Sequence, residues 1–451
     1  MKINAQEKRS YRVHEQHQTL GDVLRVGPNT VYFNDPRAVS DIYGHKAISK
    51  IGKDTFYDRL AGDFHDIVQE RDRSEHSRKR KYLSNAFALA TVVDMEPVIR
   101  ANFQNMLDRL ESFIDSTAKE KTEGDRFNIR QWFNFFTLDV IGDMAFGLPM
   151  GFTKAGVRYS ITVGQITSFR LNGILKQLAK CSGLIYSSTG SKDADDFEYM
   201  SLHQLRNRLD KGGPERSSGD FIGKILSDKD GKSRSLPLGE MLAESVVMMN
   251  AGSDTTAAAL TNTTYYLLSN PRCLAKLRKE LQEAIPADHQ GIVEYNYVRS
   301  LPYLRACIDE SLRMRPPITY PPRLVYAPEG ATVAGHFLKQ GTVVAVSPYT
   351  IHRNETVYKD PDTYDPDRWF DPDQVAALKA YNIPFSTGSR ACIGRHIAIV
   401  ELQILISTLM LKYDLALEPG QELDVFERFN ANPGPLPITA QRRSRDVEST
   451  A

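Results

Sequence analysis

Apolar positions recur with the period of an α-helix along most of this chain. The longest periodic stretch covers residues 236–269 and predicts a single helix far longer than the average protein helix. Such a helix is typical of the centre of a large helical domain. Further helices are predicted over residues 74–146, with a charged break at 119–126, over 271–284 and 304–314, and from about residue 392 onward.

Segments with strand character are few and short. They lie at residues 23–33, 323–325, 331–333 and 342–346, and a short helix is predicted between Pro36 and Gly44. Two polar loops, 187–196 and 211–219, interrupt the middle of the chain, but no shift in composition marks a domain boundary. We therefore expect one mainly α domain with a small β part over residues 1–451, ending in a disordered tail at 442–451.

Composition and charge are those of an ordinary globular protein. Of the 451 residues, 41% are hydrophobic and 25% are charged. The 57 basic and 56 acidic residues give a net charge of +1, so nothing favours nucleic acid as a partner. No uninterrupted apolar stretch is long enough to predict a transmembrane helix. The cysteines are too far apart for a disulfide framework or a zinc site, which favours a reducing compartment; they are Cys181, Cys273, Cys307 and Cys392.

Residues 385–394, Phe-Ser-Thr-Gly-Ser-Arg-Ala-Cys-Ile-Gly, carry the most specific pattern in the chain. Cys392 directly precedes a predicted helix, and because a helix N-terminus stabilises negative charge, its thiol is predisposed to ionise. Arg390 supplies a permanent cation for an anionic group such as a carboxylate. Phe385 is placed to keep water away from the sulfur. The segment therefore has the parts of a reactive or metal-binding thiol.

Two glycines complete this segment. Gly388 and Gly394 allow the backbone to pass close to a large flat ligand. A lone cysteine in a glycine-rich turn is more often structural, but five such positions at these spacings are expected by chance in roughly one such chain in 10⁴ or fewer. The segment resembles the haem-binding loop of the cytochrome P-450 family, and the resemblance extends over about residues 20–440. It implies the cytochrome P-450 fold around a buried haem, with Cys392 as the axial ligand whose thiolate favours O–O cleavage.

Two further segments match the same family. Glu310 and Arg313 lie one helical turn apart, which alone is a common surface pair, and Pro-Asp-Arg-Trp follows at 366–369. The resemblance implies that Glu310, Arg313 and Arg368 form a buried triad. Because each arginine offers several donors in a fixed fork, two arginines can hold one carboxylate firmly. The expected role of the triad is structural, namely to hold the loop of Cys392 in place.

Residues 251–256, Ala-Gly-Ser-Asp-Thr-Thr, fall inside the long predicted helix. A glycine there costs about 1 kcal/mol relative to alanine, and a buried aspartate needs a partner, so both residue types indicate a site. The segment resembles the oxygen-binding groove of the family. The resemblance implies that Thr255 hydrogen-bonds bound dioxygen and that Asp254 relays protons from solvent. The alternative is that Thr255 only bonds back to the carbonyl of Ala251.

Basic residues provide the remaining matches. His76 and Arg80 lie one turn apart, and the basic run at 78–81 is on its own most often a solvated face. By the resemblance, His76, Arg80 and Arg323 bind the haem propionates, because buried carboxylates must be paired. Many relatives have Trp where this chain has His76. His396 follows the cysteine loop and is an alternative metal ligand, but the family does not use it, and we assign it a packing or surface role.

The resemblance implies a haem-thiolate monooxygenase that activates O2 and hydroxylates, epoxidises or otherwise oxidises a hydrophobic small molecule, as in fungal secondary metabolism. The expected cofactor is haem b, with electrons from NADPH delivered by a separate P-450 reductase and also by cytochrome b5, because the chain carries no flavin or nicotinamide motif. A monomer at the cytosolic face of the endoplasmic reticulum is expected from the family. Residues 21–44 resemble fungal members just after their membrane anchor, so the anchor is expected to be missing from this chain.

Two other functions remain open at this point. A peroxide-dependent enzyme, or an isomerase or dehydratase of the same fold, needs no acid–alcohol pair, so Asp254 and Thr255 count against it. A non-enzymatic haem sensor needs no proton relay and usually carries an output domain, which the sequence does not indicate. The substrate is not specified by the sequence; the largely apolar segments expected to line its pocket are 55–67, 166–185, 246–249, 318–320 and 432–436.

Overall fold

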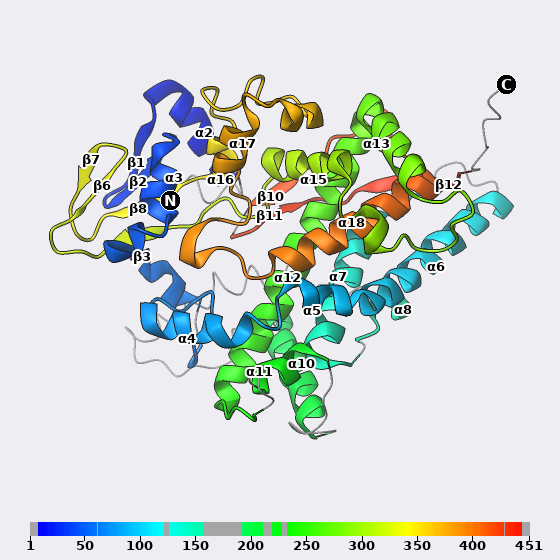
Figure 1. Cartoon of the computed structure of the whole chain (residues 1–451), viewed down its shortest axis with the longest axis horizontal. Helices are drawn as coiled ribbons and strands as arrows, with labels where there is room; N and C mark the ends of the chain where they lie inside the picture. The colour runs from blue at the N-terminus through cyan, green and yellow to red at the C-terminus, as the bar shows by residue number, and fades with distance from the viewer. Residues whose placement is uncertain are drawn as a thin grey trace.

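The computed structural model describes residues 8–60, 62–120, 126–148, 150–156, 192–210, 219–227, 232–427 and 429–443. The strands β1–β3 and β6–β8 gather on one side of the molecule, and helices fill the other side (Figure 1). The long helices α12 and α18 cross the middle and lie against one another. The expectation of a mainly helical fold with a small β part is confirmed.

Helices account for most of the described chain. They are α2 (Arg9–Leu20), α3 (Arg37–Tyr43), α4 (Arg73–Leu83), α5 (Leu89–Asp94), α6 (Glu96–Glu120), α7 (Ile129–Phe146), α8 (Phe152–Ala155), α10 (Lys192–Asp210), α11 (Phe221–Leu226), α12 (Leu238–Ser269), α13 (Pro271–Ala284), α14 (Tyr295–Val298), α15 (Pro302–Met314), α16 (Pro348–Ile351), α17 (Val375–Tyr381) and α18 (Arg395–Lys412), with the 3₁₀ turns η1 (Ala47–Ser49), η2 (Thr55–Arg59), η3 (Pro366–Phe370) and η4 (Gly388–Arg390). The predictions over 236–269, 271–284 and 304–314 are confirmed by α12, α13 and α15.

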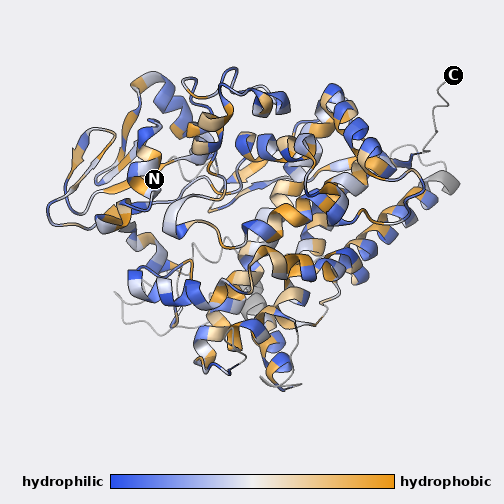
Figure 2. Ribbon diagram, in the orientation of Figure 1, coloured by the Kyte–Doolittle hydropathy of each residue, from blue (hydrophilic) through white to orange (hydrophobic). Residues whose placement is uncertain are grey.

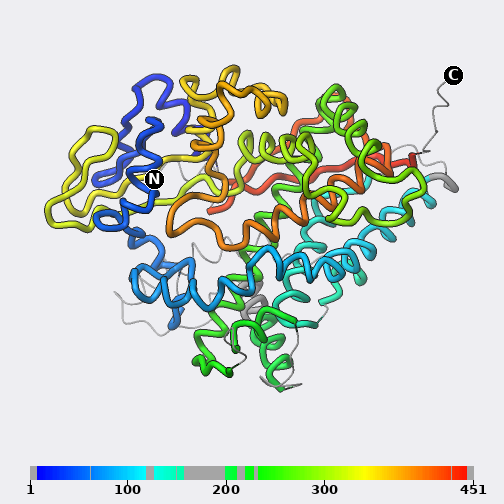
Figure 3. The backbone as a smooth tube through the Cα atoms, in the orientation of Figure 1, coloured from blue at the N-terminus to red at the C-terminus, as the bar shows by residue number. Residues whose placement is uncertain are grey.

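The strands are short and form one larger sheet and several small ones. They are β1 (Val23–Gly27), β2 (Thr30–Phe33), β3 (Ile51–Lys53), β4 (Phe127–Asn128), β5 (Arg323–Val325), β6 (Ala331–Val333), β7 (His336–Leu338), β8 (Val343–Val346), β9 (Tyr413–Ala416), β10 (Val425–Glu427), β11 (Ala431–Pro433) and β12 (Pro437–Arg442). The five-stranded sheet has the order β1-β2-β8-β5-β3. Its β2–β8 pair is parallel, with Thr30 opposite Val343, so the blue and yellow segments run side by side in Figure 3.

The main hydrophobic core lies between α7, α12 and α18. Helix α18 is apolar on nearly all sides, and its residues 399–411 are buried without interruption. Figure 2 shows the orange colour of apolar residues concentrated on α18 and on the part of α12 beside it. A helix that is apolar all round must lie inside the protein, and α18 therefore fixes the position of the cysteine loop directly before it.

Gly252 of α12 is explained by this packing. A Cβ atom at position 252 would lie 3.0 Å from Cγ1 of Ile141 on α7, which is closer than ordinary contact. The two helices are in contact along much of their length. The contact between α12 and α7 therefore gives a structural reason for the small size of Gly252, and the interpretation of this glycine as one sign of a site stays a prediction.

Two local expectations from the sequence are wrong, and more than half of the strands of the described chain were not predicted. Residues 192–196, predicted as part of a loop, begin α10, whereas 187–191 and 211–218 lie outside the described residues. The hairpin strand β7 was not predicted. Arg442, predicted to open a disordered tail, ends β12 opposite Tyr413 and ion-pairs with Glu111 and Asp115 at 2.6 and 2.7 Å. In the part of the chain that the structure describes, no helix has both the length and the apolar character needed to cross a membrane.

Candidate active site around Cys392

Cys392 lies in the loop between η4 and α18. Its backbone N–H donates to the carbonyl of Phe385 over 2.9 Å, which closes the loop. Gly388 has a φ of +71°, and a Cβ atom there would collide with the carbonyl oxygen of Tyr43, so only glycine fits. A Cβ atom on Gly394 would only make ordinary contact, 3.9 Å from the sulfur of Cys392. The glycine at 388 is therefore required by the close approach of α3, and the expectation that Gly388 and Gly394 face a flat ligand stays a prediction.

Cys392 borders a hollow of about 260 Å³ that Arg80, Arg395 and His396 also line. Burial raises the pKa of the Cys392 thiol, while the backbone N–H of Gly394, the Arg80 and Arg395 cations and the Arg395 N–H act to lower it. The N-terminus of α18 thus favours the thiolate as predicted, but it does not outweigh burial. A metal cation at the sulfur would deprotonate the thiol outright.

Five basic side chains gather beside this loop, and we call them the cation cluster: Lys53, His76, Arg80, Arg323 and Arg390. Burial and then the charges of Arg390, Lys53, Arg80 and Arg323 lower the pKa of His76 to about 3, so His76 is neutral at pH 7. Burial, Arg323 and Arg390 also hold the pKa of Lys53 well below its usual value. Lys53 was not expected from the sequence; it shares a face of β3 with the buried Ile51, which is the signal that could have revealed it.

No ion pair joins the cation cluster to an acidic side chain of the described residues, although the carboxylates of Asp66, Glu70 and Asp72 lie near enough to act on Lys53 and Arg390 through their charge. None of its lysine and arginine side chains has a carboxylate oxygen within 4.0 Å. Lys53 and Arg323 are only 8% and 6% exposed. The side chains of the cluster instead donate to uncharged backbone carbonyls. Lys53 donates to Ile67 and Val68, and Arg390 donates to Glu70 and Arg71; these four acceptors lie in residues 66–72, which we call the strap. Arg80 donates to Ala391, and Arg323 donates to Pro322.

Uncharged acceptors satisfy these donors without neutralising their charge. Burying several charges of one sign costs free energy unless an opposite charge joins them. The carboxylates of a haem would supply that charge. Arg80 lies beside the cysteine loop, because its guanidinium donates to the carbonyl of Ala391, the residue before Cys392, over 2.8 Å. A carboxylate bound to Arg80 would therefore lie close to this loop. The residues present therefore fit a haem.

Asp254 and Thr255 are adjacent on α12 but face different surroundings. The Asp254 carboxyl is 1% exposed and accepts a 3.3 Å hydrogen bond from Nδ2 of Asn134 on α7. Burial raises its pKa to about 6, against the opposing effect of Arg130 and Asn134. The hydroxyl of Thr255 donates to the carbonyl of Ala251 over 2.7 Å, which is the alternative raised in the sequence analysis. The bond uses the hydroxyl proton and leaves the oxygen lone pairs of Thr255 as acceptors.

The residues Glu310, Arg313 and Arg368, which the sequence linked, meet in the structure. Glu310 and Arg313 are fully buried and form two hydrogen bonds of 2.8 and 2.9 Å. Arg368 Nε, Trp369 Nε1 and the backbone N–H of Asp365 donate to the same carboxylate over 2.9, 3.1 and 3.0 Å. We call this group the Glu310 node, and it ties α15 to η3.

Comparison with known proteins decides the family. The profile described as "Cytochrome P450" matches residues 2–439. The chain belongs to the cytochrome P450 family. Benzoate 4-monooxygenase bphA of Aspergillus niger is 28% identical over 468 residues, 97% of this chain and 89% of that enzyme. Cytochrome P450 monooxygenase traB of Penicillium crustosum is 31% identical over 91% of this chain and 81% of its own length, and trichothecene C-15 hydroxylase of Fusarium sporotrichioides is 30% identical over 90% and 81%.

Membership of the cytochrome P450 family confirms the resemblance seen in the sequence. The protein is a haem-thiolate monooxygenase, an oxidoreductase that uses haem b and takes electrons from NAD(P)H through a redox partner. The relatives are monooxygenases and hydroxylases, which does not favour the peroxide-dependent, non-oxygenating and sensor alternatives. The haem supplies the oxygen-activating chemistry, and the polypeptide supplies binding, orientation and electrostatics.

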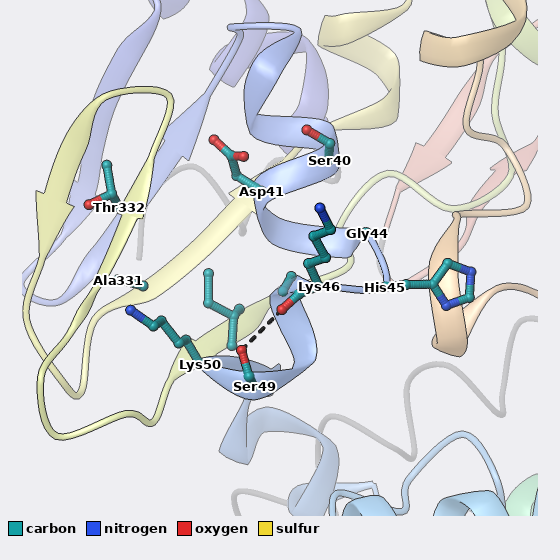
Figure 4. Close-up of a pocket in the computed structure, with 11 residues that line it drawn as sticks. Ser40, Asp41, Gly44, His45, Lys46, Ser49, Lys50, Ala331 and Thr332 are labelled. Carbon is teal, nitrogen blue, oxygen red and sulfur yellow. Dashed lines mark hydrogen bonds between the residues drawn. The ribbon is translucent and has the colours of Figure 1, made fainter.

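A second hollow of this cytochrome P450 lies away from the cysteine. Figure 4 shows it between α3, η1 and β6, with Asp41, Lys50 and Thr332 among the side chains around it. Its volume, about 600 Å³, exceeds that of the hollow beside Cys392, but it contains none of the residues assigned to the haem. Size alone therefore does not identify the active site.

Proposed function

We propose that this cytochrome P450 oxidises a hydrophobic small molecule at a haem whose iron is bound by Cys392 and whose carboxylates are held by the cation cluster. The observation that carries the proposal is the gathering of basic side chains beside the cysteine loop, in which Lys53, His76 and Arg323 are buried and no lysine or arginine side chain has a carboxylate oxygen within 4.0 Å among the described residues. His76, neutral at pH 7, serves as a hydrogen-bond donor, Arg80 and Arg323 provide charge, and a carboxylate beside Lys53 would raise its lowered pKa and favour its charged form. Arg390 positions the strap through its carbonyl contacts, and Phe385 shields the sulfur.

Asp254 and Thr255 handle protons in this proposal. A buried carboxyl with a pKa near 6 can both hold and release a proton at neutral pH, which a relay requires. Asn134 and Arg130 of α7 fix and tune Asp254, and the sequence analysis did not anticipate either residue. Thr255 donates to Ala251 and therefore accepts from a water molecule or a protonated group in the site.

Aromatic contacts support a hydrophobic substrate. Phe56 stacks on Phe429 with ring centroids 5.9 Å apart and meets Tyr320 edge-on at 6.0 Å. Two of the predicted pocket segments, 55–67 and 318–320, thus meet in space, whereas 166–185 lies outside the described residues. Apolar walls with a few polar groups are typical of sites for small organic ligands. The fungal relatives named above support a substrate from secondary metabolism.

The partners and the location follow the family expectation. We propose electron transfer from an NADPH-dependent P-450 reductase, assisted by cytochrome b5, to a monomeric enzyme at the cytosolic face of the endoplasmic reticulum. Arg80 and Arg395 beside the hollow at Cys392 give this side of the enzyme a positive charge suited to an acidic reductase surface. One domain is proposed because the main core draws residues from Ile67 to Ala440.

The direct test is the spectrum of the reduced, CO-bound protein. The unmodified chain should give the Soret band of thiolate ligation, and Cys392→Ser should lose that band together with turnover supported by the reductase. Cys273→Ala, which removes a buried thiol on α13, is the matched control and should keep both properties.

Two results would contradict the proposal. One is a histidine-type band in correctly folded protein. The other is turnover with peroxide but none with reductase, which would favour the peroxide-dependent alternative.

A further inference from the structure

His352 directly follows α16 and lies beside the Glu310 node. Its backbone carbonyl accepts from the guanidinium of Arg313 over 2.8 Å, and its ring Nδ1 lies 3.1 Å from the backbone carbonyl of Arg313. The residue is fully buried. His352 is therefore joined to the node residue Arg313 twice, once through its main chain and once through its ring.

The second nitrogen of the same ring contacts the start of the cysteine loop. Nε2 accepts from the backbone N–H of Ile383 over 2.8 Å. Ile383 lies two residues before Phe385, whose carbonyl accepts the N–H of Cys392 and closes the loop. The carbonyl of Ile383 also accepts from the N–H of Ser386 over 3.0 Å. The ring of His352 thus lies between the Glu310 node and the segment that leads to Cys392.

The two partners of the ring determine which nitrogen carries the hydrogen. The carbonyl of Arg313 can only accept, so Nδ1 carries a hydrogen, and the N–H of Ile383 can only donate, so Nε2 carries none. Burial and then the positive charge of Arg313 lower the pKa of His352 to about 3, so the ring is neutral at pH 7. Neither the protonated ring nor the other tautomer can form both hydrogen bonds.

The first part of the cysteine loop needs support from outside the loop. Ser386 has a φ of +56°, in the left-handed region that residues other than glycine rarely adopt. Such a conformation persists only where surrounding contacts hold it. The far end of the loop continues into α18, whose residues 399–411 are buried without interruption. At the near end, the hydrogen bond from Ile383 to His352 provides a corresponding attachment.

We propose that His352 is a positioning residue that attaches the cysteine loop to the Glu310 node and thereby keeps Cys392 in place as the iron ligand. The inference rests on the proposed function, because it takes the sulfur of Cys392 as the ligand of a haem. The geometry assigns this role to the ring because its two nitrogens bind different elements, α15 through Arg313 and the loop through Ile383.

Two substitutions separate the two contacts of the ring. The side-chain amide of asparagine reaches the position of Nδ1 but not that of Nε2, whereas the amide of glutamine reaches the position of Nε2. His352→Asn therefore keeps the contact with Arg313 and leaves the N–H of Ile383 without its acceptor. His352→Gln keeps an acceptor for Ile383 and is the conservative rescue.

The measurements are made on the full-length haem protein. In His352→Asn, the reduced, CO-bound protein should lose the Soret band of thiolate ligation on the order of tenfold faster than the unmodified protein. Hydrogen exchange of the Ile383 amide should accelerate by a similar factor, while the Asp365 amide, which donates to Glu310 in the node, should keep its protection. In His352→Gln, both the band and the Ile383 amide should remain close to those of the unmodified protein.

His17→Asn is the matched control. His17 is also buried, and its Nδ1 lies 2.8 Å from the carbonyl of Gly21, but α2 contributes no residue to the site. The substitution should change neither the lifetime of the thiolate band nor the exchange of the Ile383 amide.

Three results would overturn the proposal. One is a His352→Asn variant whose thiolate band lasts as long as that of the unmodified protein. Another is equal loss of protection at Ile383 and Asp365 in that variant, because His352 would then support the fold in general and not the loop. The third is an Ile383 amide that exchanges freely in the unmodified protein, which decides the matter even if no variant folds. Failure of the proposed function looks different, because the unmodified protein would then show no thiolate band at all.

Discussion

The Glu310 node is a fully buried ion pair and the cation cluster is a partly buried group of basic side chains, and their charges are compensated in opposite ways. In the node, the single carboxylate of Glu310 receives five hydrogen bonds from Arg313, Arg368, Trp369 and the backbone of Asp365. In the cation cluster, several basic groups lie together and, among the described residues, no carboxylate oxygen comes within 4.0 Å of its lysine and arginine side chains.

This difference separates structural from functional charge. A buried ion pair satisfied by its own chain holds elements together, and removing one partner leaves an uncompensated charge. A buried group of like charges is strained until a ligand of opposite sign arrives, so the chain trades stability for binding. The two groups should therefore respond in opposite ways to the loss of one member.

The largest effect is expected in the node. Glu310→Ala leaves Arg313, with a fully buried side chain, without its counter-charge, and the free energy of unfolding should fall by about 3 to 5 kcal/mol. Chemical denaturation of the haem-free protein measures this change. Glu283→Ala is the control, because its 3.9 Å pair with Lys279 is mostly exposed and should matter little. If the two substitutions lowered the free energy of unfolding equally, the Glu310 node would contribute no more to stability than an exposed ion pair does.

The sequence provides most of the larger elements and fewer of the small ones. Helices α12 and α13 were predicted because each is a long stretch of helical periodicity that begins at or directly after a proline, and the Asn270 between them marks the boundary. Strand β7 was missed because its three residues are exposed or half-exposed and have no inward-facing pattern. The start of α10 reads Lys-Asp-Ala-Asp-Asp, which resembles a loop, although acidic residues also stabilise a helix N-terminus.

The opposite response is expected for the cation cluster. Arg323→Met removes a charge that repels Lys53 and Arg390, so the haem-free protein should be as stable as before or more stable. Loss of haem should become about tenfold faster or more, because a charge-assisted contact to a carboxylate is gone. Haem transfer to apomyoglobin and denaturation of the haem-free protein measure the two quantities. A destabilised haem-free protein with normal haem retention would contradict this assignment.

The smallest effect concerns His76. Its pKa is about 3 in the folded protein and near 6.5 in the unfolded chain, so the unfolded state gains the proton first as the pH falls. Stability of the haem-free protein should therefore decline between pH 6.5 and pH 3, and His76→Gln should reduce this decline by about 1 to 2 kcal/mol. Unfolding midpoints measured at several pH values provide the check. If the variant loses stability at acid pH as steeply as the unmodified protein, burial and the neighbouring cations do not lower the pKa of His76 in the folded state.

The parts of the site in which side chains contact one another could be predicted from the sequence. Glu310, Arg313 and Arg368 could be linked by the spacing of side chains that the family uses together. The contacts of Arg390 and Lys53 were not predictable, because their partners are backbone carbonyls of the strap, which leave no trace in residue identity. The packing contact of Gly252 was not predictable for a related reason, since its neighbour Ile141 is remote in sequence.

The parallel pairing of β2 with β8 has a consequence for how this protein is made. Thr30 pairs with Val343, and 343 minus 30 leaves 313 positions that the ribosome must add before the sheet can close. At typical rates of synthesis this takes roughly 15 to 60 s. During that time β1 and β2 form at best an isolated hairpin, which is marginally stable in water and exposes Tyr32 and Phe33. A chaperone that holds the nascent N-terminal hairpin should therefore raise the yield of folded enzyme, and slower synthesis without one should lower it.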